Sequence, residues 1–155
     1  MLKYIFYIVK HKWLVFIECV KLGIWWRGIT HDLSKFNPKE FFAYAKKFTY
    51  NQESPKFTYA MLHHYQKNDH HWEHWIVPKD GSVLEMSIPA VKEMIADWKA
   101  LEKQRKIPAL EFYLKNRDKI QLAPFPRQYL ESALDVNHIV ETETVIYSPN
   151  KKATR

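Results

Sequence analysis

Four prolines stand where helices are expected to begin. Asn37-Pro38 and Ser54-Pro55 each join a capping side chain to a proline at the first helical position, and Ser87-Ile88-Pro89 and Pro108 are similar breaks. Proline fits the first turn of a helix but disrupts its interior and the middle of a sheet. With eight prolines and only three glycines, the chain favours helices separated by short breaks over a sheet with tight turns.

Between these breaks, apolar side chains recur every three to four residues, as in amphipathic helices. The expected helices cover about residues 3–22, 25–35, 38–48, 55–68, 87–101, 108–116 and 127–141, and residues 142–147 are compatible with a short strand. Glu40 is expected to reach back to Asn37 and complete a capping box. We therefore predict an all-α fold: a single-domain helical bundle of about six helices over residues 1–147, followed by a flexible basic tail over residues 148–155.

The first 26 residues are apolar, but their pattern excludes a membrane span. They carry ionisable side chains throughout, namely Lys3, Lys10, His11, Lys12, Glu18 and Lys21. The longest apolar run, residues 13–17, is far shorter than the roughly 18 residues that a span needs, and no signal-peptide cleavage site follows. A single cysteine, Cys19, cannot form an internal disulfide, which favours a reducing compartment. We expect a cytoplasmic protein with no membrane partner.

The composition indicates a packed, basic protein. Hydrophobic residues make up 46% of the chain and aromatic residues 15%, and the formal net charge is +7. Such a charge either maintains solubility or attracts an anionic partner such as a nucleotide, a phosphoester or a nucleic acid. No expected helix carries a dense lysine and arginine stripe, so nucleic acid is not the favoured partner. Exposed aromatic surface would be compatible with a homodimer.

Histidine and aspartate residues form the most informative pattern. His31 directly precedes Asp32, and on one turn of helix both side chains can reach one metal ion. His11 falls on the inward face of the first expected helix, and Asp97 lies beside the apolar stripe of a later one, where an unpaired carboxylate is costly. Imidazole and carboxylate together suit Mn, Fe, Zn, Co or Ni. We therefore expect a divalent transition metal, as one or two ions.

Five further histidines crowd into twelve residues and offer more ligands than one ion needs. If the helix continues, His64 and His71 share one face, and His63, His70 and His74 share another. A lone inward histidine is commonly a core residue, and short histidine-rich tracts can bind metal adventitiously. The ordered combination favours a built site. The preferred ligands are His11, His31, Asp32, His64, His71 and Asp97, which leaves His63, His70 and His74 for contact with a substrate.

The order of these residues resembles the HD-domain superfamily of metal-dependent hydrolases, whose hallmark is H…HD…D on a helical fold. The segment His31-Asp32-Leu33-Ser34-Lys35 is similar to the HD-x-x-K form of that motif. The chain also resembles an uncharacterised family of small phage and bacterial proteins over roughly residues 5–125. The similar segments are Trp26-Arg27-Gly28 through Phe36, Leu62-His63-His64 through Trp72, Ala96-Asp97-Trp98 and Tyr113-Leu114-Lys115-Asn116.

The resemblance to HD-domain proteins implies hydrolysis of a nucleotide or another small phosphoester by metal-activated water. Asp32 would be the ligand shared by two ions. Lys35 and Arg27 lie one turn on either side of His31, where they could bind the anionic substrate and assist catalysis. A phage-encoded protein of this kind would act in the host cytoplasm.

Two other functions remain open from the sequence. Some HD-type proteins hold two irons and oxidise a substrate with dioxygen, and the six candidate ligands would suffice for that chemistry. A basic, aromatic-rich helical domain could instead bind nucleic acid or a partner protein without catalysis, and such binding to phosphates would weaken steeply with salt.

Overall fold

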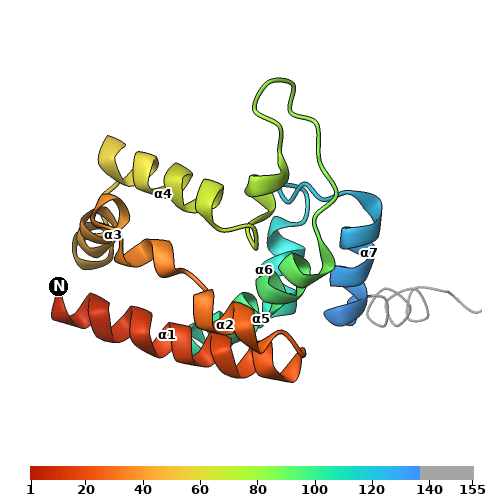
Figure 1. Cartoon of the computed structure of the whole chain (residues 1–155), viewed down its shortest axis with the longest axis horizontal. Helices are drawn as coiled ribbons and strands as arrows, with labels where there is room; N and C mark the ends of the chain where they lie inside the picture. Colours follow the sequence, from red (N-terminus) through yellow and green to blue (C-terminus); the bar gives the residue numbers. More distant parts are fainter. Residues whose placement is uncertain (137–155) are drawn as a thin grey trace, which may run out of the picture.

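Helix α5 (Ile88–Arg105) packs against helices from both ends of the described chain, namely α1 (Leu2–Lys21), α6 (Ala109–Asn116) and α7 (Pro124–Ala133). The computed structural model describes residues 1–136. The other elements are α2 (Trp25–Thr30), η1 (Leu33–Phe36), α3 (Pro38–Tyr50), α4 (Pro55–Lys67) and η2 (Trp72–Trp75), where η denotes a 3₁₀ helix. Figure 1 shows α1 and α2 along one side of the molecule, with α6 and α7 near the end opposite α3 and α4.

The core is divided among three apolar clusters, two of which include α5. One cluster joins Met94 and Ile95 of α5 to Tyr113 of α6 and Leu130 of α7. Another joins Ala96 and Ala100, on a further side of α5, to Val15 and Cys19 of α1. The third packs Tyr4 and Ile8 of α1 against Ala45 of α3. Because α5 is buried on several sides, side chains on its inner surface are held rigidly.

The all-α prediction is confirmed for the described residues, which contain seven α-helices and no strand beyond an isolated bridge between Ile76 and Val83. That bridge lies in the loop of residues 76–87, which extends from the body of the molecule (Figure 1). The helix starts at Pro38 and Pro55 are also confirmed. The side chain of Asn37 accepts a hydrogen bond from Lys39 N, and that of Ser54 accepts one from Phe57 N.

The continuous helix predicted over residues 25–35 is wrong. Helix α2 ends at Thr30, His31 is extended, and Asp32 has a left-handed backbone with φ = 54°. The physical reason lies on α1: Lys12 Nζ donates to the carbonyl oxygens of Ile29 and His31, each at 2.6 Å. Lys12 thus satisfies carbonyls that a continuing helix would have used, and aspartate tolerates the left-handed turn better than most residues.

Two other predicted boundaries need correction. Helix α7 begins at Pro124, three residues before the predicted start, because this proline occupies the first helical position. The chain leaves α7 at Ala133, and Asp135 has φ = 59°. The predicted strand over 142–147, the tail over 148–155 and the part of the predicted last helix after 136 all lie outside the described residues.

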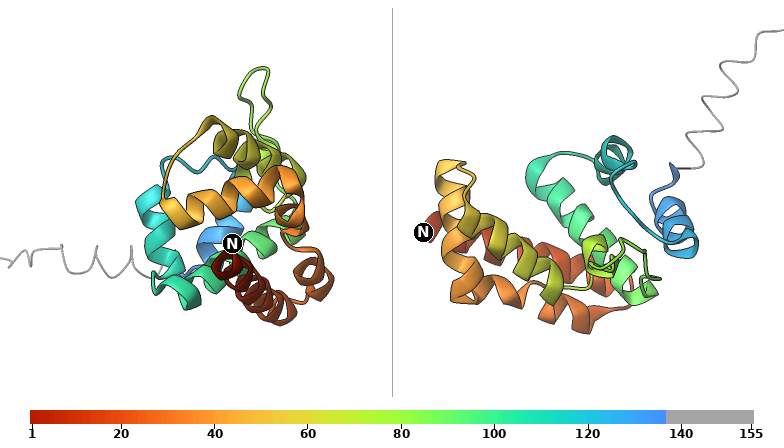
Figure 2. Two further views of the ribbon diagram at one scale, coloured as in Figure 1. Left: turned by 90° about the vertical axis from the view of Figure 1, so that its left-hand side faces the viewer. Right: turned by 90° about the horizontal axis from the view of Figure 1, so that it is seen from above.

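Two packing features bear on the site. Figure 2 shows α3 and α4 side by side, away from α6 and α7. Helices α1 and α2 approach closely at Gly28, where an added Cβ would lie 2.8 Å from the Cα of Phe16. Among the residues that the structure describes, no helix is both long enough and apolar enough to cross a membrane.

Candidate metal centre

Five segments of the chain bring histidine and aspartate side chains to one buried place. Seven residues make up this group, called here the His/Asp cluster: His11 of α1, His31 and Asp32 from the turn after α2, His64 of α4, His70 and His71 from the turn after α4, and Asp97 of α5. All are buried except His71, which is partly buried. Such burial of ionisable groups is rare unless they are paired or bind a metal.

One half of the cluster surrounds Asp97. Its Oδ1 atom lies 2.9 Å from His11 Nε2 and 3.9 Å from His31 Nε2. His31 Nε2 in turn lies 3.3 Å from Oδ2 of Asp32. The ligand atoms of His11, His31 and Asp97 all lie within 4.8 Å of one another, so one ion could contact all three.

The other half surrounds the second oxygen of Asp32. This Oδ1 atom lies 3.2 Å from His64 Nε2 and 3.5 Å from His70 Nε2. His71 Nε2 lies 2.9 Å from His64 Nε2. The two carboxylate oxygens of Asp32 therefore face different halves of the cluster. A ligand shared by two ions would be placed in this way.

Acceptors outside the cluster, two of them buried and one partly buried, fix the orientation of the imidazoles. His31 Nδ1 is hydrogen-bonded to Glu93 at 2.8 Å, His64 Nδ1 to Glu40 at 3.0 Å, and His11 Nδ1 to the amide oxygen of Gln104 at 3.2 Å. An imidazole that donates from Nδ1 presents the lone pair of Nε2 on its opposite side. Each of these Nε2 atoms faces the cluster, which is the arrangement of metal-binding histidines whose far nitrogen is held by a carboxylate or carbonyl.

Unpartnered atoms show that the residues fit a cation. Among the described residues, six buried side-chain nitrogen or oxygen atoms have no hydrogen-bond partner, and four of them face the cluster: His31 Nε2, Asp32 Oδ1, His70 Nε2 and Asp97 Oδ1. Two ligand atoms about 2.1 Å from one ion and at right angles would be roughly 3.0 Å apart, which is close to the separations found here. A divalent ion would satisfy atoms that are otherwise costly to bury.

Neighbouring charged groups shift the pKa values of residues in the cluster. Burial disfavours protonation of His31, but Asp32 and Glu93 outweigh it and raise the pKa of His31 to about 10. Burial likewise opposes ionisation of Asp97, yet the electrostatic attraction of the nearby His11, His31 and His70 lowers the pKa of that carboxyl. Without a metal ion, protonated imidazole thus balances the carboxylates, and a bound cation would replace those protons.

A third possible ligand group, of His31, His70 and Glu93, has a different role. Glu93 Oε1 contacts the Nδ1 atoms of His31 and His70, which point away from the cluster, while its Oε2 accepts from Arg27 Nε. Glu93 is therefore already satisfied as an acceptor, and it orients two imidazoles. Its position one turn before Asp97 on α5 is the only sequence signal that could have revealed it.

Glu40 is the other carboxylate that the sequence did not assign to the site. The predicted capping box is wrong, because Glu40 turns inward, is fully buried and contacts His64 with Oε2 and His63 with Oε1. The cap is made by Asn37 alone. Helix α3 begins beside the turn that carries Asp32, and this placement depends on tertiary packing.

The structure brings all six predicted ligands together and adds His70, which was expected to contact substrate. His63 lies outside the cluster on Glu40, and His74 lies at an exposed position where its Nδ1 is 3.0 Å from the carbonyl oxygen of Tyr65. Arg27 is bound to Glu93 and Asp69 and does not reach the cluster as a free cation. Lys35 Nζ lies 2.6 Å from Asp32 Oδ2.

A cleft of about 700 Å³ opens on the cluster. Its wall includes four cluster residues, three cationic side chains and a set of aromatic rings: His11, His64, His71, Asp97, Lys35, Lys47, Arg105, Tyr4, Tyr7, Tyr44, Phe48, Phe57 and Tyr65. A smaller cavity of about 300 Å³ reaches His70, His71 and Asp97 beside Trp98 and Phe112. Both cavities allow a small molecule to approach the cluster.

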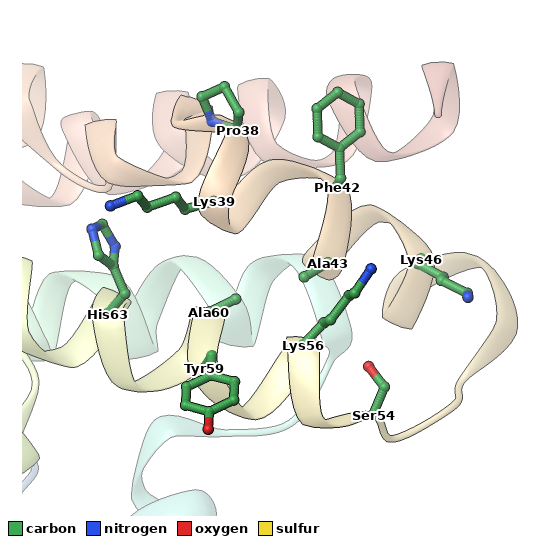
Figure 3. Close-up of a pocket in the computed structure, with 10 residues that line it drawn as sticks. All are labelled: Pro38, Lys39, Phe42, Ala43, Lys46, Ser54, Lys56, Tyr59, Ala60 and His63. Carbon is green, nitrogen blue, oxygen red and sulfur yellow. The ribbon is translucent and has the colours of Figure 1, made fainter.

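A second groove of about 700 Å³ lies between α3 and α4, as Figure 3 shows. Its lining includes Lys39, Phe42, Lys56 and His63, but no residue of the His/Asp cluster. The groove is linked to the cluster only indirectly, since His63 and His64 share Glu40. The cleft that reaches the cluster is therefore the better candidate for a substrate site.

Comparison with known proteins identifies a family. A family model matches residues 1–136, and the chain belongs to this family, which is described as a family of unknown function (DUF5662). No curated protein and no solved structure matches the chain.

Proposed function

We propose that this member of the DUF5662 family is a metal-dependent phosphohydrolase that acts on a small phosphoester, with a nucleotide as the favoured class of substrate. The observation that carries the proposal is the composition of the cleft. It combines the His/Asp cluster with three cations, Lys35, Lys47 and Arg105, and among the described residues that line it the only carboxylate is that of Asp97 in the cluster. A metal site that opens into a cationic cleft suits an anionic substrate.

The cluster would supply the reactive centre. When bound, a divalent ion polarises a phosphoryl oxygen and lowers the pKa of coordinated water from 15.7 toward about 7. In this proposal His11, His31, Asp32 and Asp97 would hold one ion, and Asp32, His64, His70 and His71 would hold a second. Glu93, Glu40 and Gln104 keep the imidazoles in the required orientation.

Lys35 would bring positive charge to the substrate phosphate. Burial disfavours its ammonium form, but Asp32 and Asp97 outweigh this and raise the pKa of Lys35 above its ordinary value, so it remains protonated. It lies against Asp32 and 5.7 Å from the ring centre of Tyr44. A phosphate beside the cluster would therefore meet a fixed cation.

Arg105 and Lys47 would hold the remainder of the anion. Arg105 donates from Nε and Nη2 to the hydroxyl of Tyr7, at 3.1 and 2.9 Å, and Lys47 is paired with exposed Glu53. Aromatic rings such as those of Tyr7 and Phe48, whose centres lie 4.9 Å apart, offer a surface for a flat group. These rings favour a nucleotide among phosphoesters.

Arg27 has a supporting role in this proposal rather than the catalytic role expected from the sequence. Its guanidinium contacts the carboxylates of Glu93 and Asp69. It would keep Glu93 ionised and in place, and through Glu93 it would orient His31 and His70.

The oxygenase alternative would use the same ligands, so activity assays are needed to distinguish a hydrolase from an oxygenase. Protein loaded with Mn or Co is expected to release inorganic phosphate from nucleoside monophosphates, and Arg105→Met is expected to raise KM without changing metal content. Arg117→Met, which alters an exposed arginine on the Glu131 side chain, serves as the control. Iron-dependent dioxygen consumption with no phosphate release would refute the proposal in favour of an oxygenase. A metal-free folded protein that binds nucleic acid in a salt-dependent way would favour the binding domain.

A further inference from the structure

The outward side of α1 carries an unpartnered apolar stripe. Six apolar residues follow one another at intervals of four, three, four, three and four: Leu2, Phe6, Val9, Trp13, Phe16 and Val20. This spacing places them along one line of a helix. The line is opposite the buried face that carries His11 and Val15. Phe6 is 70% exposed and Trp13 61% exposed, so the stripe is not covered by the described part of the chain.

Helix α2 extends this apolar surface. Gly28 packs directly against Phe16, so α2 lies beside the stripe, and it exposes Trp25 and Ile29. Phe6, Trp13 and Trp25 are each more than half exposed. Large apolar side chains exposed next to one another commonly mark an interaction site on a single protein chain.

The charges beside the stripe all have one sign. Lys3, Lys10 and Lys21 are exposed, and their spacing of seven and eleven residues places them in a row along one edge of the stripe. The only acidic residue of α1 is Glu18, which is buried and paired with Lys21 and Lys103. Helix α2 contains no acidic residue. Among the residues of α1 and α2, this surface is therefore apolar, exposes tryptophan, and has only cations as exposed charged side chains.

We propose that α1 lies in the plane of an anionic membrane surface, with the stripe inserted among the lipids and the lysine row at the headgroups. A helix with large apolar and aromatic residues beside lysines has the chemistry of an interfacial helix, and tryptophan favours the membrane interface. A second copy of the chain fits the same stripe less well, because antiparallel pairing along α1 would bring the two lysine rows together, and parallel pairing would give them no exposed acidic partner on α1. Charge complementarity selects the anionic surface.

This attachment does not require a span. The lysines that prevent α1 from crossing a bilayer are suited to its surface. The inference departs from the sequence-based expectation of no membrane partner, which rested on the absence of a spanning segment and of a signal-peptide cleavage site. Because the stripe is opposite His11, the His/Asp cluster stays on the other side of α1, and the inference is independent of the proposed hydrolase.

The test is co-sedimentation of the full chain with vesicles of phosphatidylcholine, with and without phosphatidylglycerol. Binding is expected with the anionic vesicles, together with a blue shift of tryptophan fluorescence. Trp13→Glu is expected to weaken binding at least tenfold, whereas Phe125→Glu, at an exposed aromatic position on α7, should bind like the wild type. Lys3→Gln with Lys10→Gln should also weaken binding about tenfold or more, and the control pair is Lys79→Gln with Lys115→Gln.

Two results would overturn the inference. One is the absence of binding to anionic vesicles, or equal loss of binding in the stripe and control variants. The other is a stable dimer at micromolar concentration that Trp13→Glu dissociates while lipid binding is absent, which would identify a second copy as the occupant. Circular dichroism and metal content show whether a variant that no longer binds vesicles is still folded.

Discussion

His64 and His71 approach each other nitrogen to nitrogen, with their Nε2 atoms 2.9 Å apart. His64 is hydrogen-bonded to Glu40 through Nδ1, so its Nε2 lone pair faces His71. Burial, together with the neighbouring His70 and His64, lowers the pKa of His71, which keeps this imidazole neutral. Burial opposes protonation of His64, but Asp32 and Glu40 outweigh it and raise the pKa of His64. Two ring nitrogens at this distance need either a proton or a cation between them, and Asp32 Oδ1, 3.2 Å from His64 Nε2, completes a site for the cation.

Removal of His71 is expected to weaken metal binding without loss of the fold. His71→Ala should reduce metal content and the increase in melting temperature that Mn or Zn produces, because one ligand is lost. Far-ultraviolet circular dichroism should be unchanged, since His71 lies in a turn after α4. The matched control is His74→Ala, which removes a histidine from the same segment but outside the cluster. Equal metal content in the two variants would show that His71 is not a ligand.

Glu40→Gln is expected to lower metal affinity although Glu40 is not itself a proposed ligand. The carboxylate is fully buried and holds both His63 and His64. Substitution of a group that orients a metal-binding histidine typically lowers metal affinity about 10- to 100-fold. Isothermal titration with Mn or Zn measures the effect, and Glu53→Gln at an exposed position is the control. If Glu40→Gln binds metal with unchanged affinity, Glu40 has no orienting role.

The variant Arg27→Met tests whether Arg27 holds Glu93 in place or binds the substrate. The variant leaves the carboxylate of Glu93 buried without its guanidinium partner. We expect a decrease of roughly 3 kcal/mol in the free energy of unfolding, measured by urea denaturation. Arg117→Met, in which the lost arginine is about half exposed, should change stability by less than about 1 kcal/mol. Loss of turnover with an unchanged free energy of unfolding would instead indicate that Arg27 contacts the substrate directly.

A pH-dependent contribution to stability is expected from the packing of α1 against α5. Burial alone would raise the pKa of Glu18, but hydrogen bonds from Lys103 and Lys21 outweigh it and lower the pKa below its ordinary value of 4.5. A carboxyl whose pKa is lower in the folded state stabilises the protein above the unfolded pKa, and this stabilisation is lost as pH falls through the folded pKa. The stability difference between wild type and Glu18→Gln should therefore be constant near neutral pH and shrink below about pH 4.5.

The control for this prediction is Glu111→Gln, at an exposed position on α6. It should show no comparable difference at any pH. A Glu18→Gln difference that stays constant down to about pH 2 would contradict the assigned ion pairs.

The local features of the chain were predictable because neighbouring residues determine them. Pro38 and Pro55 mark helix starts through the restricted backbone of proline, and the inward position of His11 follows from helical spacing alone. The break at His31 and Asp32 was not predictable, because it depends on Lys12 of another helix binding the carbonyls there.

For a similar reason, the sequence could not show that both His70 and His71 reach the cluster. His64 and His71 share one face only if the helix continues as far as His71, whereas α4 ends at Lys67. A turn then brings both His70 and His71 to the cluster, since residues in a turn are not restricted to one face. Glu40 and Glu93 could not be assigned to the site from the sequence, because a buried acceptor is recognised only from the imidazole that it contacts.

The most direct test of the metal centre is anomalous scattering from crystals grown with Mn. The account predicts at least one anomalous peak within the His/Asp cluster, about 2.0–2.3 Å from an oxygen of Asp32 and from Nε2 atoms of the surrounding histidines. Density for the metal-saturated protein that shows no ion in the cluster, or ions only at exposed histidines such as His74, would contradict it.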